Sequence, residues 1–137
     1  MLSDMHVNSF SSVSDLLSFL RKKSESSLFA ELCGMLGFNK QNELIYCEMQ
    51  NRSAEPDKFF ALDPYDFLKF IKDFTPIALF HSHIYGDENP SDFDIKSSNN
   101  SCLCFLIYSV TTEKFFIYEP QVKKYDVNTV EGIRNLL

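Results

Sequence analysis

The sequence of 137 residues lacks a basic surplus, a long apolar run and any tryptophan. Lys and Arg number 13 against 19 Asp and Glu, so the formal net charge is −6. Nucleic-acid binding requires a basic stripe that displaces counterions from phosphates. The only basic cluster, Arg21, Lys22 and Lys23, is short and is expected on a solvated helix end. We therefore predict no nucleic-acid partner.

Signals for membranes and for disulfides are also missing. No apolar run approaches the roughly 20 residues that cross a bilayer, and residues 1–12 lack the basic and apolar stretches of an export signal. The four cysteines are scattered through apolar segments, which indicates reduced, mostly buried thiols. They are Cys33, Cys47, Cys102 and Cys104. We expect a cytoplasmic protein with no membrane partner.

Hydrophobic spacing predicts the elements of the first half of the chain. A helix is expected from about residue 14 to 23, because Val13, Leu16, Leu17 and Leu20 share one helical face. Residues 32–38 and 44–49 read as a hairpin, and 59–62 as a short strand. Asp63 and Pro64 match an N-cap and first helical position of a second helix that ends near Asp73. Its predicted buried stripe is Phe67, Leu68, Ile71 and Phe74.

The second half begins with an apolar strand, 77–80, that leads directly into His81. A polar loop, 82–90, precedes a short helix that Ser91 and Asp94 open as a capping box. Residues 103–110 and 115–118 form a second predicted hairpin, and an apolar pattern over 127–137 predicts a C-terminal helix. This irregular mixture predicts one α+β domain over residues 1–137, with a mixed, largely antiparallel sheet flanked by helices.

The residues with the clearest chemistry are His81, His83 and Asp94. Two histidines at i and i+2 of a strand end project to the same side, so both imidazoles can reach one cation. Asp94, in the first turn of the following helix, can supply an anionic third ligand. A fourth position then stays open for water, which is typical of a catalytic zinc. We predict one Zn²⁺ per chain.

Hydrolysis by such a site also needs a proton acceptor and a group that stabilises an oxyanion. Glu31 can serve as the base if the strand after it neighbours the strand that ends at His81. Ser91 can donate its hydroxyl to the oxyanion. Each residue also has a structural interpretation: a glutamate at a strand start is usually solvated, and Ser91 caps a helix whatever else it does.

The arrangement His-Ser-His, seven residues, Ser, two residues, Asp, with an upstream Glu, resembles the JAMM motif of the MPN-domain (JAB/Mov34) metalloproteases. The matching residues are Glu31, His81, Ser82, His83, Ser91 and Asp94. The resemblance implies a cytidine-deaminase-like α+β fold in which His81, His83 and Asp94 ligate zinc. It also implies that Glu31 acts as general acid and base through the metal-bound water, and that Ser91 stabilises the tetrahedral intermediate.

The resemblance implies a zinc metalloprotease or isopeptidase whose partner is a protein or peptide substrate, such as a ubiquitin-like modifier. The short chain is similar to compact bacterial and phage members, including those of phage tail-tip assembly proteins. That origin would place it in the virion or the host cytoplasm, with tail components as partners. Two alternatives stay open: an assembly module with little or no catalysis, and a zinc hydrolase of small amides.

Overall fold

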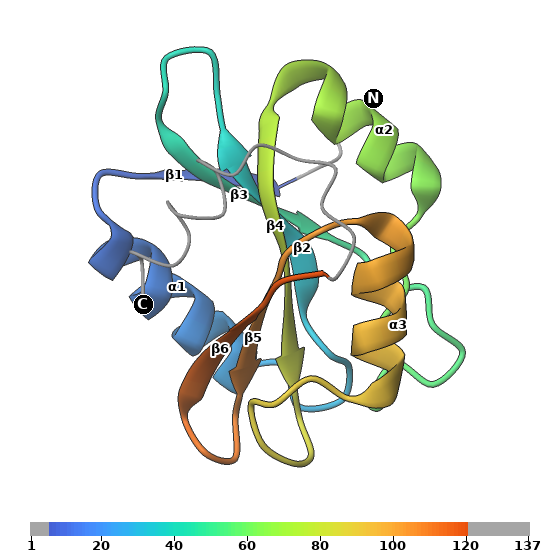
Figure 1. Cartoon of the computed structure of the whole chain (residues 1–137). Coiled ribbons are helices and arrows are strands. Elements are labelled where there is room, and N and C mark those ends of the chain that lie inside the picture. Colours follow the sequence, from blue (N-terminus) through green and yellow to red (C-terminus); the bar gives the residue numbers. More distant parts are fainter. Residues whose placement is uncertain (1–5, 121–137) are drawn as a thin grey trace.

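The computed structural model describes residues 6–120, which form a six-stranded sheet with helices on both faces (Figure 1). The helices are α1 (Val13–Glu25), α2 (Pro64–Asp73) and α3 (Asp92–Ser101). The strands are β1 (His6–Phe10), β2 (Cys33–Phe38), β3 (Leu44–Met49), β4 (Thr75–His83), β5 (Phe105–Ser109) and β6 (Lys114–Tyr118). The predicted C-terminal helix lies outside the described residues.

The strand order is β1-β3-β2-β4-β5-β6. Among these strands, only β4 and β5 pair in parallel, and all other neighbours are antiparallel. Parallel neighbours need a crossover, which α3 provides between β4 and β5. The prediction of an α+β fold with a mixed, largely antiparallel sheet is confirmed, as are both predicted hairpins, β2–β3 and β5–β6.

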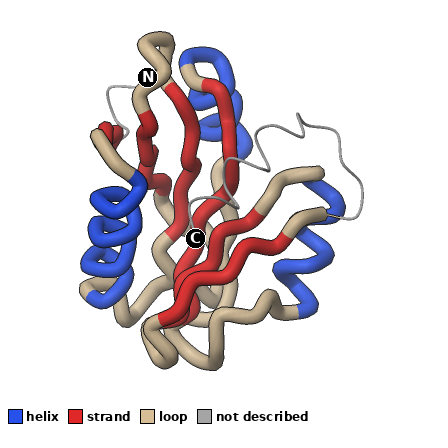
Figure 2. The backbone as a smooth tube through the Cα atoms, turned by 60° about the vertical axis from the view of Figure 1, so that its left-hand side comes forward, coloured by secondary structure: helices blue, strands red, loops and turns tan. Residues whose placement is uncertain are grey.

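The two faces of the sheet carry separate apolar cores. Helix α1 covers one face, and α2 and α3 cover the other (Figures 1 and 2). Leu16 and Leu20 of α1 are fully buried with Phe80 in the first core, whereas Phe70 of α2 is fully buried with Leu79 in the second. Leu79 of β4 belongs to the core under α2, and side chains alternate along a strand, so every second residue after Leu79 points toward α2 and α3. His81 and His83 are therefore on that face.

The start and end of α2 were predicted correctly, but its buried stripe was partly wrong. Asp63 caps the helix by accepting from Tyr65 N. Phe70 is buried, whereas Leu68 and Ile71 are 59% and 41% exposed. Gly37 explains the rotation, because a Cβ built there would lie 2.8 Å from the Phe70 ring. The Phe70 ring occupies the space that the missing side chain leaves.

Two strand predictions differ from the structure. Residues 59–62 form no strand, because the side chain of Asn51 hydrogen-bonds to their backbone in place of a neighbouring strand. Asn51 Nδ2 donates to Phe59 O, and Asn51 Oδ1 accepts from Ala61 N. Strand β1 was not predicted, since its sequence is mostly polar and exposed. It nevertheless adds to the sheet through its backbone pairing with β3.

The cysteines behave largely as predicted. Cys33, Cys47 and Cys104 are buried, Cys102 is half-buried, and none of the four forms a disulfide within the described residues. Cys102 is the C-cap of α3 and has the left-handed conformation, with φ of 60°. None of the helices between residues 6 and 120 is long and apolar enough to cross a bilayer.

Candidate metal centre

The structure brings His81, His83 and Asp94 together at the carboxyl end of β4. His81 Nε2 lies 3.1 Å from Asp94 Oδ1, and His83 Nε2 lies 2.8 Å from Asp94 Oδ2. One ligand atom from each of the three residues lies within 4.8 Å of the others. Strand β4 presents both imidazoles, and the first turn of α3 presents the carboxylate. These three residues can hold a metal ion.

The donor set fits a divalent cation. His81 is fully buried, yet neither of its ring nitrogens has a hydrogen-bond partner within residues 6–120. Its Nε2 is close to the Asp94 carboxylate but lacks the alignment of a hydrogen bond. A buried polar atom without a partner is unfavourable, and a cation would use the Nε2 lone pair. Two imidazoles and one carboxylate form a ligand set that Zn²⁺ accepts.

The charges of the three residues also suit metal binding. Burial lowers the pKa of His81, so its imidazole stays neutral. Burial alone would raise the pKa of Asp94, but its contacts with His81 and His83 hold that pKa well below the usual range. Burial opposes the protonation of His83, yet Asp94 and the carbonyl of Asp87 together raise its pKa. A metal ion would displace that proton, since only neutral histidine is a ligand.

Several contacts fix the orientation of the ligands. His83 Nδ1 lies 2.7 Å from Asp87 O, so its Nε2 faces Asp94. Asp94 Oδ2 also accepts from Ser91 N at 3.0 Å. The Phe60 ring stacks on the His81 ring with 4.4 Å between centroids. Such outer contacts hold metal ligands in register.

Glu31 lies beside this group, two residues before β2. It is only 6% exposed. Its backbone is held by Glu31 N donating to Pro56 O and by Asn51 Nδ2 donating to Glu31 O. Burial raises the pKa of Glu31 to about 8, helped by the negative charge of Asp94 and opposed by His83. A carboxyl group with such a pKa is suited to exchanging protons near neutral pH.

Ser91 and Glu31 line the same pocket, which also includes His83 and has a volume of about 270 Å³. Ser91 is the N-cap of α3, and its Oγ accepts from Asp94 N at 3.1 Å. Both parts of the predicted capping box are present. Within residues 6–120, the Ser91 hydroxyl makes no hydrogen bond as a donor, so its proton is available to an oxygen atom in the pocket.

The sequence matches the family described as prokaryotic homologs of the JAB domain over residues 13–121. The chain belongs to this family. Its fold is similar to the solution structure of a protein from Desulfitobacterium hafniense, with a TM-score of 0.59 and 22% sequence identity. The similarity covers 85% of this chain and 93% of that one. No curated protein matches the chain significantly.

In this JAB-family domain, the His81, His83 and Asp94 group is compatible with a JAMM-type metalloprotease. Membership supplies the fold, whereas the chemistry depends on the side chains that this particular chain retains. All the residues singled out for the site in the sequence lie in or beside one pocket, and none was placed elsewhere by the fold.

The positioning roles of two residues, Ser82 and Asn51, were not predicted from the sequence. Ser82 Oγ accepts from Leu32 N at 2.8 Å, which joins the metal strand to the segment that carries Glu31. Asn51 Nδ2 donates to the carbonyls of Glu31, Pro56 and Phe59. Ser82 stands within the motif, so its place between two histidines was a usable signal. Nothing in the local sequence distinguishes Asn51 from an ordinary loop asparagine.

Proposed function

We propose that this chain is a zinc-dependent metalloprotease or isopeptidase of the JAMM type. One observation carries the proposal: a buried glutamate, Glu31, lines the same pocket as His83, whose imidazole meets Asp94 and His81 in a group able to hold a metal. A purely structural cation site has no need of a buried acid with a raised pKa beside it. The substrate would be a protein or peptide, such as one joined to a ubiquitin-like modifier.

His81, His83 and Asp94 would hold the zinc ion. When bound, zinc makes water more acidic and polarises a carbonyl group. Glu31 would accept a proton from the attacking water and deliver it to the leaving nitrogen. A C–O bond forms, the amide C–N bond breaks, and the amine leaves with the transferred proton. The Ser91 hydroxyl would donate a hydrogen bond to the carbonyl oxygen as negative charge develops on it.

The test uses the full chain loaded with zinc. Zinc content is measured first, and a library of short internally quenched peptides and isopeptides is then screened for cleavage. Glu31→Gln should lower kcat by about 10²-fold or more, because proton transfer is lost while the fold and ligands remain. Glu55→Gln, which removes an exposed acid in the neighbouring loop, is the matched control. Equal rates for Glu31→Gln and the wild type would refute the proposal.

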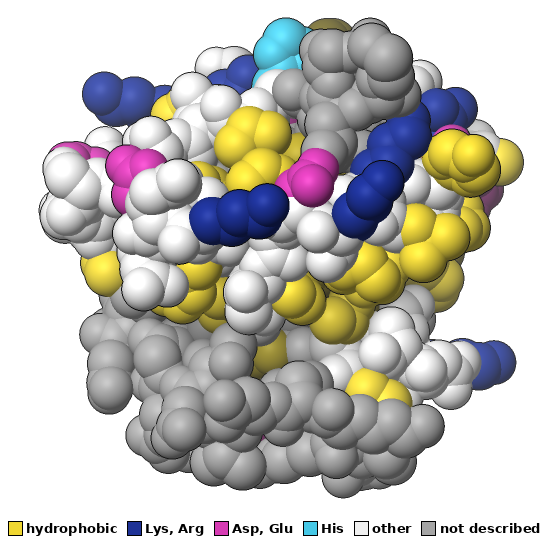
Figure 3. Space-filling view, turned by 90° about the horizontal axis from the view of Figure 1, so that it is seen from above, with side chains coloured by type: hydrophobic (Ala, Val, Ile, Leu, Met, Phe, Trp, Pro, Cys, Tyr) yellow, Lys and Arg dark blue, Asp and Glu magenta, His cyan; other side chains and the backbone are white. Residues whose placement is uncertain are grey.

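A second candidate is an assembly module, such as one of a phage tail tip. One observation favours it: the outer side of α2 exposes Tyr65, Leu68 and Ile71, which are 69%, 59% and 41% exposed. Figure 3 shows hydrophobic side chains among lysines and arginines at the end of the molecule that carries α2. His83→Ala separates the candidates, because it should abolish cleavage but leave assembly intact if the domain is only structural.

A further inference from the structure

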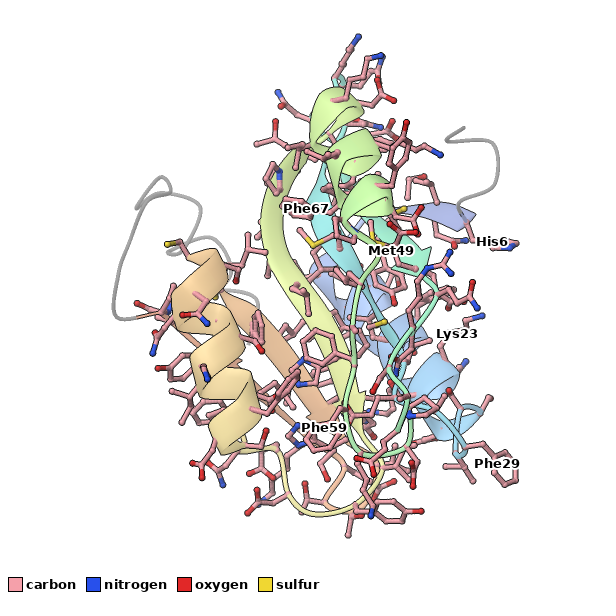
Figure 4. All side chains as sticks on the ribbon, turned by 90° about the vertical axis from the view of Figure 1, so that its right-hand side faces the viewer. His6, Lys23, Phe29, Met49, Phe59 and Phe67 are labelled. Carbon is pink, nitrogen blue, oxygen red and sulfur yellow. The ribbon has the colours of Figure 1, made fainter. Side chains whose placement is uncertain are left out.

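An apolar groove lies between α2 and α3, on the face of the sheet that carries the metal ligands. Its volume is about 470 Å³. The lining includes Phe60, Leu62, Phe67, Leu79, Phe93 and Phe105. Phe67 projects from α2 on this side of the molecule, which Figure 4 views directly. Apart from serine hydroxyl groups on α3, the side chains that line the groove are apolar.

The groove is joined to the candidate metal centre by aromatic rings. Phe60 stacks on His81 at 4.4 Å between centroids, and Phe105 meets the same imidazole edge-on at 5.4 Å. Phe93, the residue before Asp94, packs against Phe60 at 5.9 Å and is 39% exposed. Rings that form the walls of the groove therefore also pack against a metal ligand.

The groove also adjoins the polar pocket that contains Glu31. Lys58 and Ser91 line the polar pocket, whereas Phe60 and Phe93 line the groove. Lys58 and Phe60 are two positions apart in one segment of the chain, and Ser91 and Phe93 are two positions apart in another. An extended polypeptide advances about 3.3 Å per residue and alternates its side chains between two sides. A chain with its scissile carbonyl in the polar pocket can therefore place a nearby side chain in the groove.

We infer that this groove binds a large apolar side chain of the polypeptide substrate, one or two residues from the scissile bond. The occupant is a substrate side chain because Phe60 and Phe105, which line the groove, also pack on His81 of the candidate metal centre. Its apolar lining offers no partner for a charged side chain. This inference rests on the proposed function. Burial of a Leu or Phe side chain would raise kcat/KM by about 10- to 100-fold over a small polar one.

The test compares peptide pairs that differ only near the scissile bond, with Leu or Phe in one member and Ser in the other. Ser97→Trp fills the groove from α3, where Ser97 is half-buried, and Asn100→Trp adds the same bulk at an exposed position of the same helix. Ser97→Trp should lower kcat/KM for the apolar peptides about 10-fold or more and leave the serine peptides unchanged. Asn100→Trp should change neither.

Binding supplies a second readout that does not depend on cleavage. Fluorescence anisotropy of the same peptides is measured on zinc-loaded Glu31→Gln, with and without Ser97→Trp. Preferential binding of apolar peptides that Ser97→Trp abolishes supports the groove, even if nothing is cleaved and the protease proposal fails. Cleavage without apolar preference overturns the groove and leaves the protease proposal standing.

Other occupants of the groove give different results. If Ser97→Trp changes the oligomeric state, a second copy of the chain fills the groove and the inference is wrong. If it lowers the melting temperature far more than Asn100→Trp and leaves peptide preference unchanged, the chain itself fills the groove, which also overturns the inference. The absence of both binding and cleavage refutes the groove and the protease together.

Discussion

Ser82 and Leu32 form two hydrogen bonds that join the end of β4 to the segment before β2. Leu32 N donates to Ser82 Oγ at 2.8 Å, and Ser82 N donates to Leu32 O at 2.9 Å. Leu32 follows Glu31 directly, and Ser82 stands between His81 and His83. This pair therefore sets the position of the proposed general base relative to two metal ligands.

Ser82→Ala should impair catalysis more than it impairs metal binding. The change leaves Leu32 N without its acceptor in a buried site, which costs about 1–3 kcal/mol in the free energy of unfolding. It should also lower kcat, because the segment that carries Glu31 loses its hydrogen bond to Ser82 Oγ. Zinc affinity should stay close to that of the wild type. Chemical denaturation, kcat and zinc titration measure the three effects.

Ser98→Ala is the matched control, because Ser98 is also fully buried and its hydroxyl donates to Leu103 O, away from Glu31. It should lose stability without the specific loss in kcat. Parallel losses of kcat in both variants would show that Ser82 acts only through general stability.

The sequence predicted most elements because their signals are local. Periodicity and caps identified α1, α2 and α3, and apolar runs separated by turn residues identified the two hairpins. Strand β1 escaped detection because an exposed edge strand is held by backbone pairing, which any sequence can provide. The buried face of α2 was predicted only in part, because it depends on Gly37, which lies on β2, far from α2 in the sequence.

For the site, the motif pointed to the ligands, but their supports came from the fold. His83 is oriented by a backbone carbonyl, that of Asp87, which carries no side-chain signature. The raised pKa of Glu31 comes from its burial, which a polar residue at a strand start does not reveal. Side-chain spacing can thus indicate which groups converge, whereas their orientation and protonation depend on packing between segments distant in sequence.

The two roles of Ser91 can be separated by substitution. Glycine is nearly as good as serine at an N-cap, so Ser91→Gly should lower the free energy of unfolding by only about a few tenths of a kcal/mol. It removes the hydroxyl, however, and should lower kcat by about 10²-fold. Ser91→Thr keeps the hydroxyl and should retain most of the activity.

Ser12→Gly is the control for Ser91, because Ser12 caps α1 and lies outside the pocket. Thermal denaturation and steady-state kinetics distinguish the roles. A Ser91→Gly variant with undiminished kcat would show that Ser91 acts only as a helix cap.

Metal removal should lower the stability of the protein. A ligand that binds only the folded state stabilises it by mass action, by about 4 kcal/mol when its free concentration is a thousand times Kd. A chelator should therefore lower the Tm of the wild type and loosen the 82–93 loop, which hydrogen exchange would detect. His83→Ala should respond to chelator much less, whereas His6→Ala, at an exposed position in β1, should respond like the wild type. Equal Tm values for the wild type with and without chelator would contradict this.

Cysteine reactivity should be confined to one residue in the folded protein. Burial raises the pKa of the Cys33 and Cys47 thiols to about 12, so neither forms the reactive thiolate at mildly alkaline pH. Cys104 is fully buried, while Cys102 is half-buried at the end of α3. A thiol reagent should label Cys102 first, as mass spectrometry would show, and the others only in denaturant. Rapid labelling of Cys33 in the folded protein would be inconsistent with its burial.

Glu31→Gln should stabilise the protein after chelation, increasingly so as the pH rises. The pKa of Glu31 is raised from 4.5 to about 8, chiefly by burial. Between these values the unfolded chain loses the proton and the folded chain keeps it, so a rising pH favours unfolding of the wild type. The glutamine side chain of the variant cannot ionise, so the variant should gain up to ~1.4 kcal/mol over the wild type per pH unit in this window.

The difference in unfolding free energy should be small near pH 4.5, grow until about pH 8 and then level off. Denaturant titrations of the chelated wild type and variant across this range measure it. Glu55→Gln, at an exposed position, should show no such trend. The trend should weaken when zinc is added, because a nearby cation favours the ionised carboxylate. A pH-independent difference in chelator would mean that Glu31 is not buried as described, and its suitability as a base near neutral pH would be lost with that burial.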